Sequence, residues 1–255
     1  MTPFDTLLSP SDLALAFAVA GLAGTIKGLV GFAMPMILMS GLGMFLSPEL
    51  ALAGLILPTL VTNGMQALQH GVGSALASVR RYAVFLIIGL IFLLTSAQLV
   101  PVLPAWLILL LIGVPITGFA LMQLFGLHFT LAKPSRRIEV TFGAAAGFIG
   151  GLSGIWGPPT VAYLTALNTP KAEQMRVQGV IYGLGAVALL MAHTSSGVIR
   201  GETLPFSLGL VIPSVLGMWL GGRLQNRIDQ SGFRRATLVV LLIAGLNLMR
   251  LGIMG

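Results

Sequence analysis

Hydrophobic residues run through this chain in ten stretches, separated by charged residues or by Gly and Pro. A helix that crosses about 30 Å of hydrocarbon needs about 20 apolar residues. The pattern therefore predicts membrane helices, and the stretches on either side of two Gly/Pro-rich motifs are shorter than a full crossing. The ten predicted segments are 12–28, 32–46, 49–70, 82–100, 102–125, 140–151, 155–167, 177–193, 203–222 and 236–249.

The composition supports this pattern, because 56% of the residues are hydrophobic and only 8% are charged. Such a balance excludes a water-soluble globular domain. The chain has no cysteine, which excludes disulfides, thiol nucleophiles and thiolate metal sites. The basic residues behind the net charge of +7 are scattered over short connections, which favours membrane topology over nucleic-acid binding. The polar stretches 126–139 and 222–235 are expected to be loops.

The two Gly/Pro-rich motifs are related in sequence. Residues 24–36 (GTIKGLVGFAMPM) return 123 positions later as residues 147–159 (GFIGGLSGIWGPP). Gly and Pro interrupt helices, and paired interruptions in two halves of a membrane protein point to the binding site of a transporter. We interpret the pair as an internal duplication that divides one membrane domain into repeats 1–126 and 127–255. The identical positions are Gly24/Gly147, Ile26/Ile149, Gly28/Gly151, Leu29/Leu152, Gly31/Gly154 and Pro35/Pro158.

The distribution of Lys and Arg predicts the topology. If each motif enters the membrane and returns to the same side, eleven basic residues share one face, against two on the other. The positive-inside rule then places the eleven in the cytoplasm and both termini in the periplasm. The predicted fold is an all-α polytopic membrane protein with two inverted-topology repeats, each a broken or re-entrant hairpin plus three crossings. The eleven are Arg80, Arg81, Lys133, Arg136, Arg137, Lys171, Arg176, Arg223, Arg227, Arg234 and Arg235, opposed by Arg200 and Arg250.

The interruptions, called here the first tip (residues 28–34) and the second tip (residues 153–157), are the predicted binding site for an anion. At each tip a helix begins inside the membrane, with free N–H groups and the positive end of its dipole. The alternative is that the glycines only allow helices to pack closely. Gly89, outside both motifs, is expected to be peripheral. The predicted substrate-binding residues at the tips are Gly28, Gly31, Phe32, Ala33, Met34, Ser153, Gly154, Ile155, Trp156 and Gly157.

Polar side chains near the tips extend the predicted site. Lys27 is a cation at bilayer depth, which indicates a functional role unless the side chain reaches the interface. Asn63, Gln66, Gln178 and Tyr182 lie at helical spacing in apolar helices, so they line a cavity or hydrogen-bond between helices. The three histidines are too far apart in the predicted topology for a metal site, and no cofactor or metal is expected.

Both motifs, their spacing and the chain length resemble the sulfite exporter TauE/SafE family of membrane permeases. The resemblance covers essentially the whole chain. It implies transport of sulfur-containing anions, such as sulfite or organosulfonates, across the bacterial cytoplasmic membrane. The sequence departs from the usual glycine run of the family at Trp156, and at Phe32 and Ala33, which leaves the identity of the substrate open.

These observations favour a secondary transporter that moves small anions by alternating access, and the resemblance implies an exporter. No Asp or Glu lies in a central segment, which argues against an enzyme. No Walker motif is present, so the gradient of the anion or coupling to protons or sodium would drive transport. An anion channel, an intramembrane enzyme and a scaffold are the alternatives. The expected partners are a small anionic substrate and the lipid bilayer but no nucleic acid, and a homodimer is left open.

Overall fold

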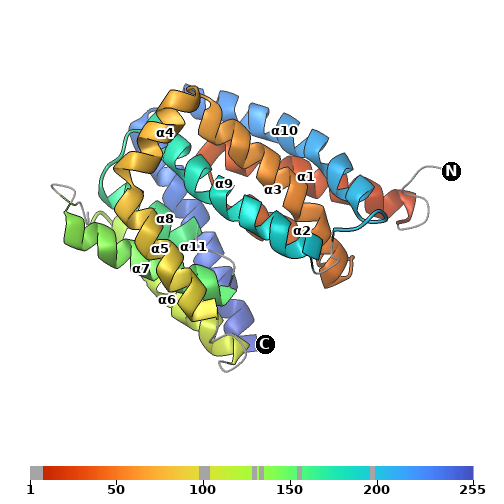
Figure 1. Cartoon of the computed structure of the whole chain (residues 1–255), viewed down its shortest axis with the longest axis horizontal. Coiled ribbons are helices and arrows are strands. Elements are labelled where there is room, and N and C mark those ends of the chain that lie inside the picture. Colours follow the sequence, from red (N-terminus) through yellow and green to blue (C-terminus); the bar gives the residue numbers. More distant parts are fainter. Residues whose placement is uncertain are drawn as a thin grey trace. The chain divides into compact units, whose positions relative to one another are not determined.

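The computed structural model describes residues 8–97, 104–127, 131, 135–153, 157–195 and 199–254, and all regular structure within them is helical (Figure 1). This confirms the predicted all-α class. The helices are α1 (Pro10–Val30), α2 (Met34–Leu42), α3 (Pro48–Leu68), α4 (Val72–Arg81), α5 (Ala83–Ala97), α6 (Ala105–Leu124), α7 (Arg136–Ser153), α8 (Gly157–Ala166), α9 (Lys171–Ser195), α10 (Leu204–Arg227) and α11 (Gln230–Met254).

Several helices in the described part of the chain are long and apolar enough to cross a membrane. Four qualify alone, namely α1, Leu50–Leu68 of α3, α10 and α11. The bent pair α4 and α5, with an angle of 69° at the break, makes a fifth if it counts as one span. The chain is therefore a polytopic membrane protein with four or five candidate spans among these residues, whereas the sequence predicts six crossings and two hairpins.

The first segment is longer than predicted, because capping residues extend it at both ends. Ser9 Oγ accepts a hydrogen bond from the N–H of Asp12, and Pro10 occupies the first turn. Gly31, in the left-handed region with φ of 88°, ends the helix. The resulting 21-residue helix is long enough to cross the membrane, so the prediction of a short first arm is wrong.

Two predicted connections are also helical. Most of the expected loop at 222–235 belongs to α10 and α11, which leaves only Ile228 and Asp229 between them. Asp229 Oδ1 accepts from the N–H of Gly232 at 2.7 Å and so caps α11. Helix α4, which was not predicted, precedes Tyr82 and ends with two arginines. In both places, charged residues lie at the ends of helices, and a sequence rich in charged residues was predicted to be a connection.

The helices form two compact units that interleave along the sequence. The first unit contains α1, α2, α3, α10 and the part of α9 from Gln178 onwards. The second contains α4 to α8, α11 and α9 up to Val177. Each unit thus draws helices from both predicted repeats, 1–126 and 127–255, and the repeat assignment itself stays a prediction.

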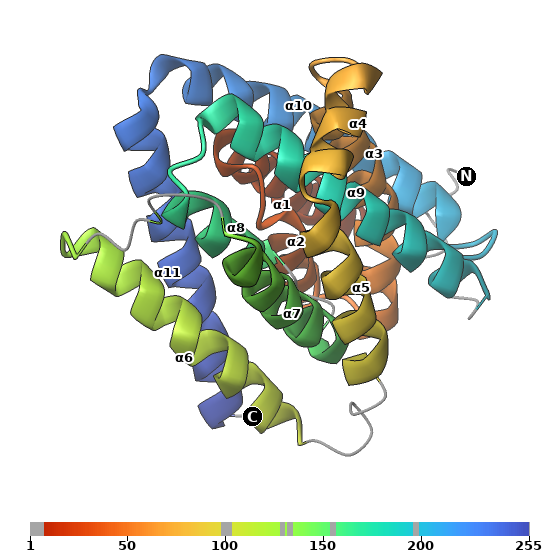
Figure 2. The same cartoon turned by 60° about the vertical axis from the view of Figure 1, so that its left-hand side comes forward.

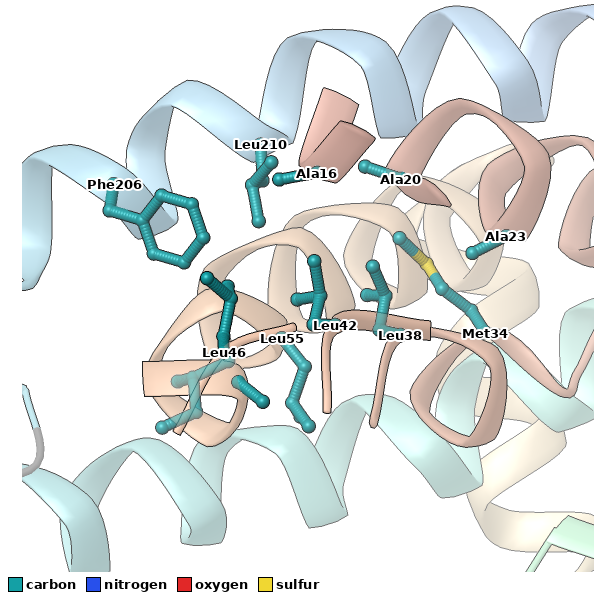
Figure 3. Packing of buried hydrophobic residues seen from close by; sticks show 12 residues of the cluster. Ala16, Ala20, Ala23, Met34, Leu38, Leu42, Leu46, Leu55, Phe206 and Leu210 are labelled. Carbon is teal, nitrogen blue, oxygen red and sulfur yellow. The ribbon is translucent and has the colours of Figure 1, made fainter. Parts of the chain in front are cut away.

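In the first unit, α2 runs back along α1 (Figure 3). Alanines on α1 face the larger side chains of α2, so that Ala23 lies near Met34, and α10 contributes Phe206 and Leu210 to the same core. Small residues on one helix and larger ones on the next allow dense packing. The fully buried members of this core are Ala16, Ala20, Ala23, Met34, Leu38, Leu42, Ala51, Ile56, Phe206 and Leu210.

In the second unit, α8 is buried along its length from Pro158 to Ala166. Tyr163 of α8 stacks on Phe85 of α5 at 5.6 Å and on Phe142 of α7 at 5.1 Å between ring centroids. Helices α6 and α11 pack against each other, as do α5 and α7 (Figure 2). The short arm after the second tip is therefore a core element of its unit.

Glycines allow close backbone approach at the main helix crossings. A Cβ placed on Gly24 or Gly28 of α1 would overlap backbone oxygens of α10, and one on Gly147 of α7 would overlap the carbonyl oxygen of Gly89. Small residues of this kind are typical where membrane helices pack. Gly89 is therefore part of the α5–α7 crossing, whereas its expected position away from the binding site stays a prediction.

Candidate functional site

Within the first tip, residues 31–33 form an irregular connection between α1 and α2. The N–H of Gly31 donates to the carbonyl oxygen of Lys27 at 2.7 Å and closes the last turn of α1. Ala33 is a non-glycine residue with φ of 73°, a conformation that costs about 1–3 kcal/mol and clusters at functional sites. Met34 then begins α2, with Pro35 in the first turn as predicted.

Lys27 points into the first unit rather than towards the membrane surface. Its side chain is only 1% exposed, and Nζ donates a hydrogen bond to Oδ1 of Asn63 on α3. Among the described residues, no carboxylate forms an ion pair with it. The alternative that Lys27 reaches the interface does not fit this arrangement, because the side chain is buried and Nζ is bonded to Asn63.

Two glutamines bind the backbone at the end of α1. Gln66 of α3 donates from Nε2 to the carbonyl oxygen of Gly31 at 3.0 Å. The Gln178 amide of α9, oriented so that its nitrogen faces acceptors, donates to the carbonyl oxygens of Val30 and Gly31 at 3.2 and 3.1 Å. Both glutamines have 0% exposure, so these are fully desolvated bonds. We call Lys27, Asn63, Gln66 and Gln178 the tip cluster.

The close contact of α3 and α9 brings the tip cluster together. A Cβ on Gly179 would lie 2.5 Å from the backbone nitrogen of Ala67, and one on Gly183 would lie 3.8 Å from Cβ of Asn63. Thr62, which the sequence analysis missed, is fully buried and donates from Oγ1 to Sδ of Met34 at 3.3 Å. The four-residue spacing of Gly179 and Gly183 was a signal for this crossing.

The other residues predicted at the first tip are buried in the first unit but differ in their surroundings. Gly28 faces the Met218 backbone of α10, on the packed side of α1. Phe32, Ala33 and Met34 are 2%, 6% and 0% exposed. Tyr182 lies one turn beyond Gln178 on α9 and is 7% exposed.

The second tip is only partly within the described residues. Gly154, Ile155 and Trp156 lie outside them, and Ser153 is described only as the last residue of α7. Gly157 begins α8. The predicted roles of these five residues therefore stay predictions.

Two helix ends of opposite sign meet at the first tip. The C-terminal end of α1 has a partial negative charge on its last carbonyl groups, and the N-terminal end of α2 has a partial positive charge on its first N–H groups. The tip cluster provides donors at the end of α1, whereas Ala33 has no side chain that can cap α2. The charge of Lys27 and the first N–H groups of α2 are the features of this arrangement that could attract an anion. Within the described residues, no group of three or more His, Asp or Glu side chains could hold a metal ion.

Comparison with known families identifies the family of the chain. Residues 16–248 match the family described as sulfite exporter TauE/SafE, which covers nearly the whole chain and both tips. A search of curated proteins and a search of solved structures gave no match. A match of this extent, together with the apolar helices, shows that the chain is a multi-pass membrane protein and belongs to the sulfite exporter TauE/SafE family.

Proposed function

We propose that the protein is a secondary transporter of the bacterial cytoplasmic membrane that exports small sulfur-containing anions, sulfite or organosulfonates, by alternating access. The family supports a transporter of such anions rather than an enzyme. The single observation that carries the proposal is the burial of the Lys27 ammonium group, with a neutral amide as its described partner, at the end of an interrupted membrane helix.

A buried ammonium group needs a counter-charge. Removing an isolated charge from water costs several kcal/mol after relaxation of the protein, and a neutral acceptor compensates only part of that cost. Asn63 Oδ1 accepts one of the three N–H bonds of Lys27. An anionic substrate next to Lys27 would supply the missing charge, with further donors from the start of α2.

The packing of corresponding helices supports two related halves. The offset of 123 residues between the motifs relates α1 to α7 and the α5 region to α10. Accordingly, α1 packs on α10 in the first unit and α7 packs on α5 in the second, each through a motif glycine, Gly24 or Gly147. A pseudo-two-fold axis, as between the inverted repeats of secondary transporters, would relate these two pairings, and we extend the proposal to that architecture.

Basic residues at helix ends support the membrane orientation that the sequence predicts. Arg80 and Arg81 end α4, and Arg227 ends α10. One turn earlier on α10, the Arg223 guanidinium lies 3.5 Å from the ring centroid of Trp219, which is 52% exposed. A half-exposed Trp next to Arg is typical of a membrane interface. We therefore assign these ends to the cytoplasm and both termini to the periplasm.

Uptake into liposomes of purified, reconstituted protein tests the proposal. Labelled sulfite and sulfonates should accumulate with saturable kinetics, and unlabelled anion on the opposite side should accelerate exchange. Flux that does not saturate and shows no exchange would indicate a channel instead. The variant Lys27→Met should weaken anion binding by about 1 kcal/mol or more, roughly fivefold, because the counter-charge is lost.

Two control variants accompany Lys27→Met: one keeps the positive charge at position 27, and the other removes a different lysine. Lys27→Arg should retain part of the binding, since the positive charge remains. Lys171→Met removes a lysine at the start of α9 and should leave binding unchanged. If Lys27→Met binds and transports every tested anion like the wild type, Lys27 is not the counter-charge and the proposal fails.

A further inference from the structure

The first tip joins two helix ends whose electrostatic preferences conflict. The last carbonyl groups of α1 attract cations, and the first N–H groups of α2 attract anions. Unwound carbonyl groups in membrane transporters do coordinate sodium, so exposed carbonyl oxygens at this place would work against an anion. Selectivity for anions therefore requires that the end of α1 be covered.

The structure shows how that end is covered. Two carbonyl oxygens, those of Val30 and Gly31, accept hydrogen bonds from the side-chain amides of Gln66 and Gln178 at 3.0 to 3.2 Å. The two amides come from different helices, α3 and α9, and both residues have 0% exposure. Lys27 adds a positive charge in the last turn of the same helix. At the start of α2, by contrast, no side chain among the described residues forms a capping hydrogen bond.

We propose that Gln66 and Gln178 are positioning residues that make the first tip selective for anions, because their amides occupy the carbonyl oxygens at the end of α1. This inference rests on the proposed function and refines it. The two glutamines were predicted from sequence to touch the substrate, whereas here they act on the backbone of the tip. Lys27 and the start of α2 are left to face the anion.

The inference is tested by removing the amide donors while keeping the side-chain volume. In proteoliposomes, Gln66→Met and Gln178→Met should each raise KM for labelled sulfite by about tenfold or more, because the carbonyl oxygen of Gly31 loses one of its two amide donors. Gln178→Met also removes the amide donor to the carbonyl oxygen of Val30. Each variant should also lose discrimination between a charged competitor, ethanesulfonate, and its neutral analogue, ethanesulfonamide. The wild type should be inhibited far more strongly by the sulfonate than by the sulfonamide.

Two further variants separate this role from general loss of stability. Gln123→Met removes a buried glutamine that accepts from Arg234 at 2.7 Å in the second unit, and it should keep the wild-type discrimination even if it is less stable. Gln178→His retains an N–H donor and should recover part of the discrimination that Gln178→Met loses. Gln178→His also tests the inference if Gln178→Met does not fold.

The outcomes distinguish this inference from the proposed function. Wild-type protein that transports neither sulfite nor any sulfonate would refute the proposed function itself. Wild-type protein that transports sulfite but is inhibited equally by the two competitors would overturn the inference alone. So would folded Gln66→Met and Gln178→Met variants with the KM and discrimination of the wild type.

Discussion

Two adjacent glycines of α10, Gly221 and Gly222, predict opposite effects of the same substitution. A Cβ on Gly221 would overlap the carbonyl oxygen of Thr25 and lie 2.8 Å from the backbone nitrogen of Leu29 on α1. A Cβ on Gly222 would have no atom within 4 Å. Both residues are inside the same helix, so Gly221→Ala and Gly222→Ala differ mainly in what the new methyl group meets.

The expected magnitudes follow from these contacts. Replacing Gly by Ala within a helix gains about 1 kcal/mol of helix propensity, and this gain is common to both variants. At Gly221 the methyl group meets backbone atoms, which cannot rotate away, so α1 and α10 must separate by about 1 Å and lose part of their dispersion contacts. Overpacking of this kind costs about 1–3 kcal/mol. Gly221→Ala should therefore be less stable than Gly222→Ala by about 1–3 kcal/mol.

Reversible unfolding of the purified variants in mixed micelles, titrated with a denaturing detergent, measures this difference. Gly222→Ala should be as stable as the wild type or up to about 1 kcal/mol more stable. Gly221→Ala should unfold at a lower fraction of denaturant. Equal stability of the two variants would refute the close α1–α10 crossing, and with it the interpretation of Gly24 and Gly28 as packing residues.

Two further predictions concern topology and the first tip. On this cysteine-free background, single cysteines at Ser47 and Arg80 should react with an impermeant reagent from opposite sides of the membrane. The reason is that the proposed orientation places Ser47 in the periplasm and Arg80 in the cytoplasm. Labelling of both positions from the same side would contradict the topology. Gly31→Leu should abolish uptake, because a bulky side chain at the tip would block the anion. The strain at φ of 88° costs only about 1–3 kcal/mol, so the protein should still fold. Uptake at the wild-type rate would place the site elsewhere.

The local features of the candidate site were predictable from sequence. The helix break after Lys27 follows from Gly31 and Pro35, and a polar stripe at helical spacing identified Asn63 and Gln66. These signals depend on residues within a few turns of one another. The structure brings those side chains together with Gln178 at the end of α1.

The partners of each helix were not predictable in the same way. The packing of α1 on α10 joins segments far apart in sequence through Gly24 and Gly217, and a glycine alone does not indicate which helix it faces. Likewise, the pattern of side chains along the sequence does not indicate that Gln66 and Gln178 bind backbone carbonyl groups. Single-sequence periodicity identifies faces of helices, but pairing depends on shape complementarity between distant surfaces.

The interleaving of the two units has a consequence for synthesis of the protein in the cell. Helices α1 to α3 emerge from the ribosome first, but their unit also requires α10 and the part of α9 from Gln178 onwards. The glycine-lined side of α1 thus stays without its partner until residue 227 has been made, and lipid or an insertion factor must cover it meanwhile. A chain that terminates after α9 would leave both units incomplete, so neither unit can fold completely before the last two helices are made.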